Sequence, residues 1–215
     1  MTTTWPLSSV TMEFGPIVVR YDGRVLTPRP WTLLQSRWAA ELAPQAAAGP
    51  ILELCAGAGQ IGLAAAVLTG RPLVQVEADP VACGYAATNA ALAGRAQDVD
   101  VRHARIDTAL DVAERFPIIM ADPPYLPSDD VQRWPDDPRS AIDGGTDGLD
   151  LIRLCLQVAQ QHLPPAGMLL LQVAGEAQAR AVRELVDTTT TCSVRPGETR
   201  HHDRDRAVML LTAGR

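Results

Sequence analysis

The sequence predicts an α/β protein built on a mostly parallel sheet. Hydrophobic runs of strand length alternate with alanine-rich helical segments, a glycine-rich turn follows the first run, and the tetrad Asp122-Pro123-Pro124-Tyr125 follows the fourth. Such alternation is typical of a parallel sheet with crossover helices. Ligands of these sheets bind at the carboxyl ends of the strands, where we expect both motifs to lie.

The predicted elements follow one another along the chain. Strands are expected at residues 51–55, 73–77, 99–103, 117–121 and 168–173, and helices at 60–68, 81–93, 149–162 and 176–187. Residues 193–196 and 207–212 are a candidate antiparallel pair, and their connector, 198–206, is too polar to be buried. The longest segment without predicted regular structure, 123–148, begins with the tetrad, and loops of that length are usually functional or disordered.

A different block precedes the first core strand. Residues 17–20 and 24–26 flank Tyr21-Asp22-Gly23, and Asp-Gly between alternating residues predicts a hairpin turn. A helix is expected at 32–42, and Gly49-Pro50 then interrupts the chain. We therefore divide the chain into a hairpin-and-helix cap, residues 1–48, and a main domain, residues 49–215.

Composition limits the class of protein. A chain of 215 residues fits one domain with a small appendage, and a net charge of −6 is the wrong sign for general adhesion to nucleic acid. There is no apolar run of membrane-spanning length, and residues 1–14 lack the pattern of a secretory signal. Four scattered cysteines, at 55, 83, 155 and 192, indicate free thiols in a reducing cytoplasm. Oligomeric state is left open.

The glycine-rich turn predicts a nucleoside site. Gly57, Gly59 and Gly62 satisfy G-x-G-x-x-G, and Glu77 lies 18 positions beyond Gly59 at the end of the next predicted strand. Glycines let the backbone approach a ligand, and the acid would accept ribose hydroxyls. The alternative is a tight strand–helix turn without a ligand.

The same segment resembles motif I of the class I S-adenosylmethionine (SAM) methyltransferases, an acidic residue followed by Gly-x-Gly-x-Gly. Glu53 and the carbonyls near residues 55–57 would accept the ammonium of SAM, and Asp107 matches the family position that meets the adenine amino group. A helix N-cap or solvated loop acid is the alternative for Asp107. The implied cofactor contacts are Glu53, Cys55, Ala56, Gly57, Ala58, Gly59, Glu77, Asp107, Thr108 and Asp122. Cys55 and Ala56 stand where Gly-x is common.

The tetrad has the chemistry of a pocket for a flat, nitrogen-bearing group. Proline fixes φ and lacks an N–H, so the segment offers carbonyl acceptors, and Tyr125 offers a face for stacking. Asp-Pro-Pro is also an ordinary opening of a loop. Its place after a buried strand and downstream of the glycine turn favours the functional interpretation.

Further motifs surround the tetrad. They are Asp137-Pro138, Ala141-Ile142, Gly144-Gly145 and Asp147-Gly148-Leu149 downstream, Val-Leu-Thr-Pro-Arg-Pro-Trp-Thr at 25–32, and Asp205-Arg206 before the last strand. Together they resemble the HemK/PrmC family of SAM-dependent protein-glutamine N5-methyltransferases, which modify peptide-release factors. The resemblance covers most of residues 16–212. It implies a Rossmann-like class I methyltransferase fold, with a mostly parallel seven-stranded sheet, an antiparallel C-terminal strand, and a release-factor-like protein as partner.

The resemblance also implies roles for the tetrad. The side chain of residue 122 and the Pro123 carbonyl would accept the two N–H bonds of an amide, while Tyr125 stacks on its plane. A carboxylate makes a charge-assisted bond and could take the proton afterwards. The catalytic candidates are therefore Asp122, Pro123, Pro124 and Tyr125.

Three departures from the family keep other acceptors open. Asp122 stands in place of Asn, Gln172 in place of Glu, and no counterpart of the family's helical N-terminal domain is expected. Asp at the tetrad is frequent in methyltransferases acting on adenine amino groups in nucleic acid. The alternatives are an exocyclic amine of adenine, a small molecule, or a catalytically silent SAM-binding or scaffold protein. The acidic charge counts against duplex DNA.

Residues outside the tetrad and the glycine turn are also candidates for the site. Arg29 and Thr32, of the Pro-Arg-Pro-x-Thr segment, are candidate substrate contacts, and the alternative for Arg29 is a surface side chain packed on Trp31. Trp134 would either shield the pocket or anchor the long loop. The segment 201–206 is a solvated hairpin rather than a metal site, and neither a Ser/His/Asp triad nor a metal-ligand cluster emerges.

Overall fold

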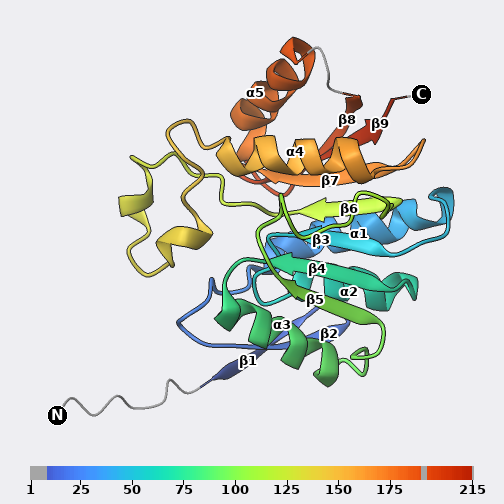
Figure 1. Cartoon of the computed structure of the whole chain (residues 1–215). Helices are drawn as coiled ribbons and strands as arrows, with labels where there is room; N and C mark the ends of the chain where they lie inside the picture. Colours follow the sequence, from blue (N-terminus) through green and yellow to red (C-terminus); the bar gives the residue numbers. More distant parts are fainter. Residues whose placement is uncertain (1–8, 190–192, 215) are drawn as a thin grey trace.

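The computed structural model describes residues 9–189 and 193–214. Within them, one sheet has the strand order β5-β4-β3-β6-β7-β9-β8 (Figure 1). Its strands are β3 (Ile51–Leu54), β4 (Leu73–Glu77), β5 (Val99–His103), β6 (Ile118–Ala121), β7 (Met168–Val173), β8 (Val194–His201) and β9 (Ala207–Ala213). Strands β3 to β7 pair in parallel, while β9 is antiparallel to both β7 and β8. The predicted seven-stranded sheet with an antiparallel C-terminal strand is confirmed.

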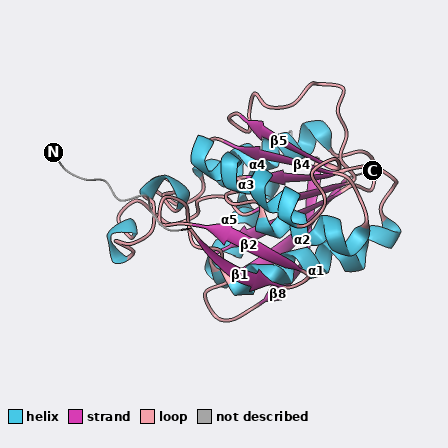
Figure 2. Ribbon diagram, turned by 90° about the horizontal axis from the view of Figure 1, so that it is seen from below, coloured by secondary structure: helices cyan, strands magenta, loops and turns pink. Residues whose placement is uncertain are grey.

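Helices cover both faces of the sheet (Figures 1 and 2). They are α1 (Leu33–Leu42), α2 (Gln60–Thr69), α3 (Pro80–Leu92), α4 (Asp150–His162) and α5 (Gly175–Thr188), with short 3₁₀ turns η1 (Pro30–Thr32), η2 (Ala43–Gln45), η3 (Val131–Arg133) and η4 (Arg139–Ala141). One hydrophobic cluster includes residues of α4 and α5, and the other includes residues of α1, α2 and α3. The sheet is therefore the middle layer of three.

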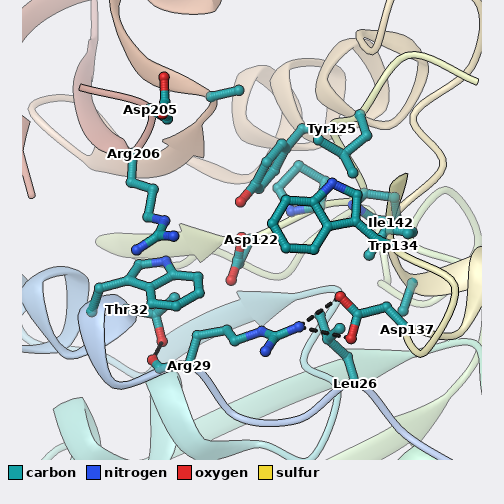
Figure 3. Close-up of a pocket in the computed structure, with 16 residues that line it drawn as sticks. Leu26, Arg29, Thr32, Asp122, Tyr125, Trp134, Asp137, Ile142, Asp205 and Arg206 are labelled. Carbon is teal, nitrogen blue, oxygen red and sulfur yellow. Dashed lines mark hydrogen bonds and ion pairs between the residues drawn. The ribbon is translucent and has the colours of Figure 1, made fainter. Parts of the chain in front are cut away.

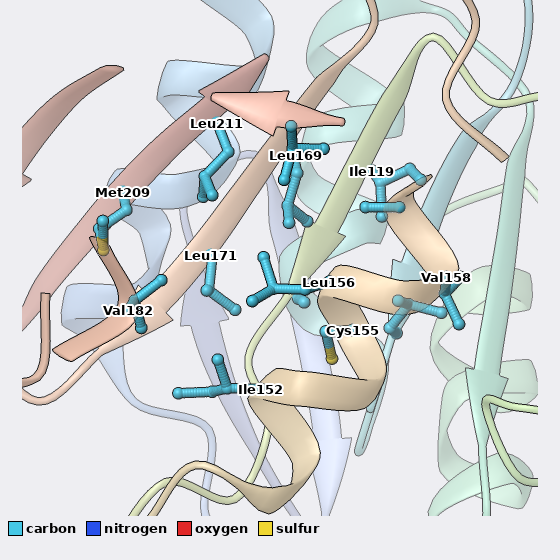
Figure 4. Packing of buried hydrophobic residues seen from close by; sticks show 14 of the residues in the cluster. Ile119, Ile152, Cys155, Leu156, Val158, Leu169, Leu171, Val182, Met209 and Leu211 are labelled. Atoms are coloured by element: carbon cyan, nitrogen blue, oxygen red, sulfur yellow. The ribbon is translucent and has the colours of Figure 1, made fainter. Parts of the chain in front are cut away.

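Alternation along the strands assigns side chains to these two cores. In β7, Leu169 and Leu171 belong to the cluster that includes α4, whereas Met168 and Leu170 belong to the opposite cluster. Successive side chains of a strand point to opposite faces, so a strand buried on both sides reads as one continuous apolar run. Figure 4 shows side chains of α4, such as Leu156, facing those of β7.

The predicted N-terminal hairpin is wrong in position. The paired strands are β1 (Val10–Phe14) and β2 (Ile17–Tyr21), and their turn contains Gly15 at φ +57°. Asp-Gly at 22–23 comes after the hairpin instead. The Asp22 carboxylate is buried and accepts hydrogen bonds from the Arg24 guanidinium and the Tyr85 hydroxyl, which lower its pKa below the usual range. The turn therefore anchors the chain to α3 and connects no paired strands.

The C-terminal connector is shorter than predicted. Strand β8 continues to His201, because Thr199, Arg200 and His201 pair with residues of β9. The turn is therefore confined to residues 202–206, between β8 and β9. Its last residue, Arg206, is half-buried, contrary to the expectation that the connector lies wholly in solvent.

Asn89 joins the hairpin to the glycine turn of the main sheet. Its side-chain carbonyl accepts from the Arg20 amide at 2.7 Å, and its Nδ2 donates to the carbonyls of Arg20 at 3.0 Å and Ala58 at 2.8 Å. The hairpin and α1 also share a hydrophobic cluster with the sheet, through Val19 and Trp38. The division of the chain at residue 48 stays a prediction.

None of the helices in the described part of the chain is long and apolar enough to cross a membrane. Cys55, Cys83 and Cys155 are free thiols. Cys192 and residues 1–8 lie outside the described residues.

Replacing Asn89 by alanine should destabilise the protein by about 2–3 kcal/mol, because three backbone groups would lose their partner. The free energy of unfolding, from urea denaturation, measures this. Thr88→Ala, one residue earlier on the exposed side of α3, is the matched control and should change it by no more than about 0.5 kcal/mol. Equal effects of the two substitutions would contradict the bridging role.

Candidate active site

Two adjacent cavities lie at the carboxyl edge of the parallel strands. The first encloses about 470 Å³ and the second about 380 Å³. Four residues, Leu26, Asp122, Pro124 and Ala141, line both cavities. Both volumes lie in the range of roughly 300–1,000 Å³ that small-molecule sites occupy. Because Asp122 faces both spaces, ligands in the two cavities would meet at its carboxyl group.

The first cavity contains most of the predicted cofactor contacts. Cys55, Ala56, Gly57, Ala58, Glu77, Asp107 and Asp122 line it. Three predicted contacts, Glu53, Gly59 and Thr108, are not among its lining residues. Asp107 forms an ion pair with Arg105 at 3.1 Å, and Arg105 also lines the cavity. The Arg105 guanidinium lowers the pKa of Asp107.

The glycine turn has the backbone geometry that its sequence predicts. Gly57 has φ +55°, and a side chain there would meet nothing within 4 Å, so its backbone borders open space. Gly59, at φ +81°, is the N-cap of α2. Cys55 has φ +58°, in the region that favours glycine, which explains why glycine is common at this position. The Glu77 carboxylate holds the turn by accepting from the Gly57 amide at 2.7 Å.

Glu53 lies behind the turn and braces it. Its carboxyl group accepts from the Gly62 amide at 2.8 Å and from Gln75 Nε2 at 2.6 Å, and Gln75 Nε2 also donates to the Gly59 carbonyl. Burial raises the pKa of Glu53 to about 7, against the effect of these hydrogen bonds. Glu53 therefore fixes the shape of the turn from inside the sheet. Gln75, fully buried in β4, was not recognised from the sequence.

The second cavity is formed around the tetrad (Figure 3). It is lined by Leu26, Arg29, Trp31, Thr32, Asp122, Pro123, Pro124, Tyr125, Leu126, Trp134, Asp137, Ala141, Ile142, Ala174, Asp205 and Arg206. The Asp122 carboxyl has no hydrogen-bond partner within residues 9–189 and 193–214, and burial raises its pKa to about 7. Burial and the neighbouring Asp122 raise the pKa of Tyr125, which keeps its phenol protonated.

The loop after the tetrad is held by specific contacts. The Asp143 carboxylate accepts from Ser128 Oγ at 2.7 Å and from the Gly145 amide at 3.1 Å. A Cβ on Gly144 would lie 2.8 Å from the Pro124 carbonyl oxygen, so only glycine lets the loop pass this close to the tetrad. The Gly144-Gly145 pair thus has a packing reason, and the loop forms a defined wall of the cavity.

Arg29 and Thr32 both line the second cavity. Arg29 Nη2 contacts the two carboxylate oxygens of Asp137 at 2.7 and 2.6 Å, which ties the N-terminal segment to the loop. The Arg29 guanidinium carbon also lies 5.7 Å from the centre of the Trp31 ring. Arg29 therefore lines the cavity, where a substrate contact is expected, and also lies near Trp31, as the packing alternative expects. Thr32 Oγ1 donates to the Arg29 carbonyl. Trp134 is 47% exposed and lines the cavity.

Arg206 was not recognised as a site residue from the sequence. It precedes the first residue of β9, and Ala207 pairs with Val173 at the carboxyl end of β7. Because β9 is antiparallel, its beginning lies at the same sheet edge as the ends of the parallel strands. That topology and the Asp205-Arg206 motif are the signals in the sequence, whereas the prediction of a solvated hairpin over 201–206 places Arg206 outside the site.

Comparison with solved structures identifies the fold. The ribosomal protein L11 methylase of Lactobacillus delbrueckii subsp. bulgaricus matches with a TM-score of 0.65 at 15% identity, covering 90% of this chain and 84% of that one. A methyltransferase from Pyrococcus furiosus matches with a TM-score of 0.68 at 18% identity, covering 94% and 91%. The fold is that of the Rossmann-like class I methyltransferases, whose cofactor is SAM.

Sequence comparison identifies the family. No protein-family model matches the chain. Release factor glutamine methyltransferases are 34% identical in Geobacter sulfurreducens, over 85% of this chain and 64% of the relative, and 30% identical in Deinococcus radiodurans, over 97% and 75%. The chain belongs to the release factor glutamine methyltransferase family. It spans less than two thirds of the length of the Geobacter protein and 58% of the Cereibacter sphaeroides relative.

Replacing Asp122 by asparagine should stabilise the protein at alkaline pH. With its pKa raised to about 7, the folded state binds a proton that the unfolded state has released. The free energy of unfolding therefore falls as pH rises from roughly 4 to 7. An amide does not titrate, so the variant is spared this loss. From pH 5 to pH 8, the free energy of unfolding of the variant relative to that of wild type should rise by on the order of 1–2 kcal/mol.

Urea denaturation at both pH values measures this gain. Asp129→Asn, which changes an exposed acid in the same loop, is the control and should follow the wild type at each pH. An Asp122→Asn variant that also follows the wild type would show that the carboxyl group is ionised in the folded protein already at pH 5.

Proposed function

We propose that this chain is a SAM-dependent N-methyltransferase and that its acceptor is a glutamine side-chain amide of a protein. The observation that carries the proposal is the position of Asp122 at the boundary of two cavities. One cavity has the glycine turn and the acids suited to a nucleoside, and the other has the tetrad. Membership of the glutamine methyltransferase family supports the choice of acceptor.

The first cavity fits SAM. Gly57 leaves open space at the turn, and the Glu77 and Asp107 carboxylates line the cavity as acceptors for ribose hydroxyls and an adenine amino group. Glu53 acts through the turn in this scheme, because it supports Gly62 and lies outside the lining. SAM supplies an electrophilic methyl group when bound, so the protein's task is positioning and exclusion of water.

The second cavity fits a planar nitrogen acceptor. The Asp122 carboxyl is unengaged by described residues, so it is available to accept an N–H of the substrate and then its proton, which its raised pKa favours. The Pro123 carbonyl is a candidate second acceptor, and Tyr125 offers a face for stacking. The aromatic side chains of Trp31 and Trp134 complete the wall and limit access of water.

Asp122 also favours a second candidate acceptor. A carboxylate in place of the family's asparagine suits a nitrogen that must lose a proton, such as an exocyclic amine of adenine or of a small molecule. A protein that binds SAM without transferring its methyl group remains the alternative from another class. The free thiols of Cys55, Cys83 and Cys155 support a cytoplasmic setting for each of them.

The decisive experiment is transfer of labelled methyl groups. The protein is incubated with labelled SAM and either a purified release factor or a fractionated lysate, and the labelled species are identified by mass spectrometry. Label on a glutamine nitrogen is the expected result. Label on nucleic acid or a small molecule would replace the acceptor, and SAM binding with no transfer would favour the scaffold. Millimolar SAM should also raise the melting temperature, and no shift would count against every SAM-dependent function.

Substitution of Asp122 tests its role in transfer. Asp122→Ala should lower kcat by about 10²- to 10⁴-fold, because it removes both the hydrogen-bond acceptor and the proton acceptor. The wild-type rate should rise with pH through about 7, as the Asp122 carboxyl ionises. Asp122→Asn keeps an acceptor oxygen, so it should lose less activity and show a flat profile between pH 6 and pH 8.

Affinity for SAM is the control for both variants and should stay within about threefold, since the cofactor cavity keeps its other lining residues. An undiminished rate in Asp122→Ala would remove the tetrad carboxyl from the mechanism.

A further inference from the structure

Arg206, the residue before β9, projects into the second cavity (Figure 3). We call this space the acceptor cavity, and the first one the cofactor cavity. Its guanidinium carbon lies 3.7 Å from the centre of the Trp31 ring, a stacked arrangement that fixes the plane of the group. Both Arg206 and Asp122 act electrostatically on Tyr125, with opposite effects on its pKa. A cation and a carboxyl group therefore face the same small, aromatic-walled space.

The two arginines of this cavity differ in how far they are engaged. Arg29 contacts both oxygens of Asp137, at 2.7 and 2.6 Å, so its charge is matched. Among the residues that the structure describes, Arg206 has one ion-pair contact, from Nη1 to Asp203 at 3.2 Å, and the Asp203 side chain is 41% exposed. Its Nε and Nη2 groups have no hydrogen-bond partner within the described part of the chain. Arg206 thus presents free donors to the cavity.

We propose that Arg206 is a substrate-binding residue that donates hydrogen bonds to the oxygen of an acceptor carboxamide while Asp122 accepts from its nitrogen. The inference rests on the proposed function and adds what that function leaves open, namely which group recognises the rest of the amide. A carboxamide has an acceptor oxygen and a donor nitrogen on one planar carbon. The cavity is lined by a donor, Arg206, and an acceptor, Asp122, together with the aromatic side chains of Trp31 and Tyr125.

Arg206 and Asp122 together also account for the movement of charge during methyl transfer to the amide nitrogen. When the amide N–H proton passes to the Asp122 carboxylate, the electron pair of that bond stays on the nitrogen and is shared with the oxygen. The guanidinium of Arg206 stabilises the negative charge that develops on this oxygen. The same nitrogen pair then forms the new bond to the methyl carbon of SAM, while the carbon–sulfur bond breaks and its electron pair stays on the sulfur, which leaves as the thioether of S-adenosylhomocysteine. The oxygen returns to a neutral carbonyl. Asp122 ends protonated, and its raised pKa favours that state.

Recognition of the oxygen predicts a specific discrimination. An amine of the same length that lacks the carbonyl satisfies Asp122 and leaves the Arg206 donors unpaired. A glutamine side chain and an ornithine side chain form such a pair, because ornithine carries CH₂ where glutamine carries C=O. Loss of Arg206 should therefore weaken binding of a glutamine peptide and not that of an ornithine peptide.

The test uses the full chain loaded with S-adenosylhomocysteine, at pH 8, and two acetylated peptides that differ only in a central glutamine or ornithine. Dissociation constants are measured by ligand-observed NMR titration for wild type, Arg206→Met, Arg206→Lys and Arg200→Met. Arg200 is the matched control: it lies on β8, stacks 4.4 Å from the centre of the Trp38 ring, and does not line the cavity. S-adenosylhomocysteine affinity is measured for each variant to show that the fold is retained.

Arg206→Met should weaken glutamine-peptide binding by about 10- to 100-fold. It should leave ornithine-peptide binding unweakened or tighten it, because the ornithine side chain is an ammonium at pH 8 and the substitution removes a like charge from the cavity. Arg206→Lys should recover part of the loss, since an ammonium donates without the planar fork. Arg200→Met should behave as wild type toward both peptides. This difference between peptides is a readout that general damage to the fold would not produce.

Two results would overturn the proposal: no binding of the glutamine peptide to wild type, or equal losses for the two peptides in Arg206→Met. Failure of the proposed function is a separate outcome. If the glutamine peptide binds in an Arg206-dependent way and the protein with labelled SAM does not methylate it, the amide subsite stands and the proposed reaction is wrong.

Discussion

The register of the parallel strands places the groups of the site next to one another. Leu54 at the end of β3 pairs with Val76 of β4 on one side and with Ala121 of β6 on the other. The residues that follow these three, Cys55, Glu77 and Asp122, therefore lie at one edge of the sheet despite their separation in sequence. A shift of one residue in any strand would turn its side chains to the opposite face and separate the glycine turn from its supporting acid. Both cavities depend on this alignment.

Two carboxyl groups near this edge are removed from solvent to different extents, at a cost to stability: Glu53 is buried within β3 and Asp122 is half-buried. Glu53 and Asp122 both have pKa values raised to about 7, and the main cause in each case is removal from solvent. The neighbouring charge of Asp122 adds to the upward shift of the Glu53 pKa. The reasons for retaining them differ. Glu53 is engaged by Gln75 and the Gly62 amide, so its place is structural. Asp122 has no such bonds among the described residues, and an unpaired acid that lines a cavity with a raised pKa is typical of a residue kept for chemistry.

The sequence predicts those parts of the site that depend on local motifs and strand ends. Gly57, Glu77 and Asp122 line the cavities because each follows or ends a strand whose hydrophobic run is unmistakable. The hairpin was misplaced because turn chemistry at Asp22-Gly23 does not reveal that the Asp22 carboxylate is buried against Tyr85. The Asp205-Arg206 motif contributes to the family resemblance, but the place of Arg206 in the cavity does not follow from it. The stacking of Arg206 on Trp31 joins segments 175 residues apart in the sequence, which no local pattern reports.

The two cavities also differ in what builds them, and this bears on the departure of Asp122 from the family. Strand ends and the glycine turn form much of the cofactor cavity, whereas the acceptor cavity needs the N-terminal segment, the loop after the tetrad and the start of β9. Asparagine and aspartate have nearly the same shape, so the substitution leaves these walls unchanged. What it alters is the capacity to hold a proton at the point where the cavities meet. The departure from the family pattern therefore concerns proton transfer more than the fit of the acceptor.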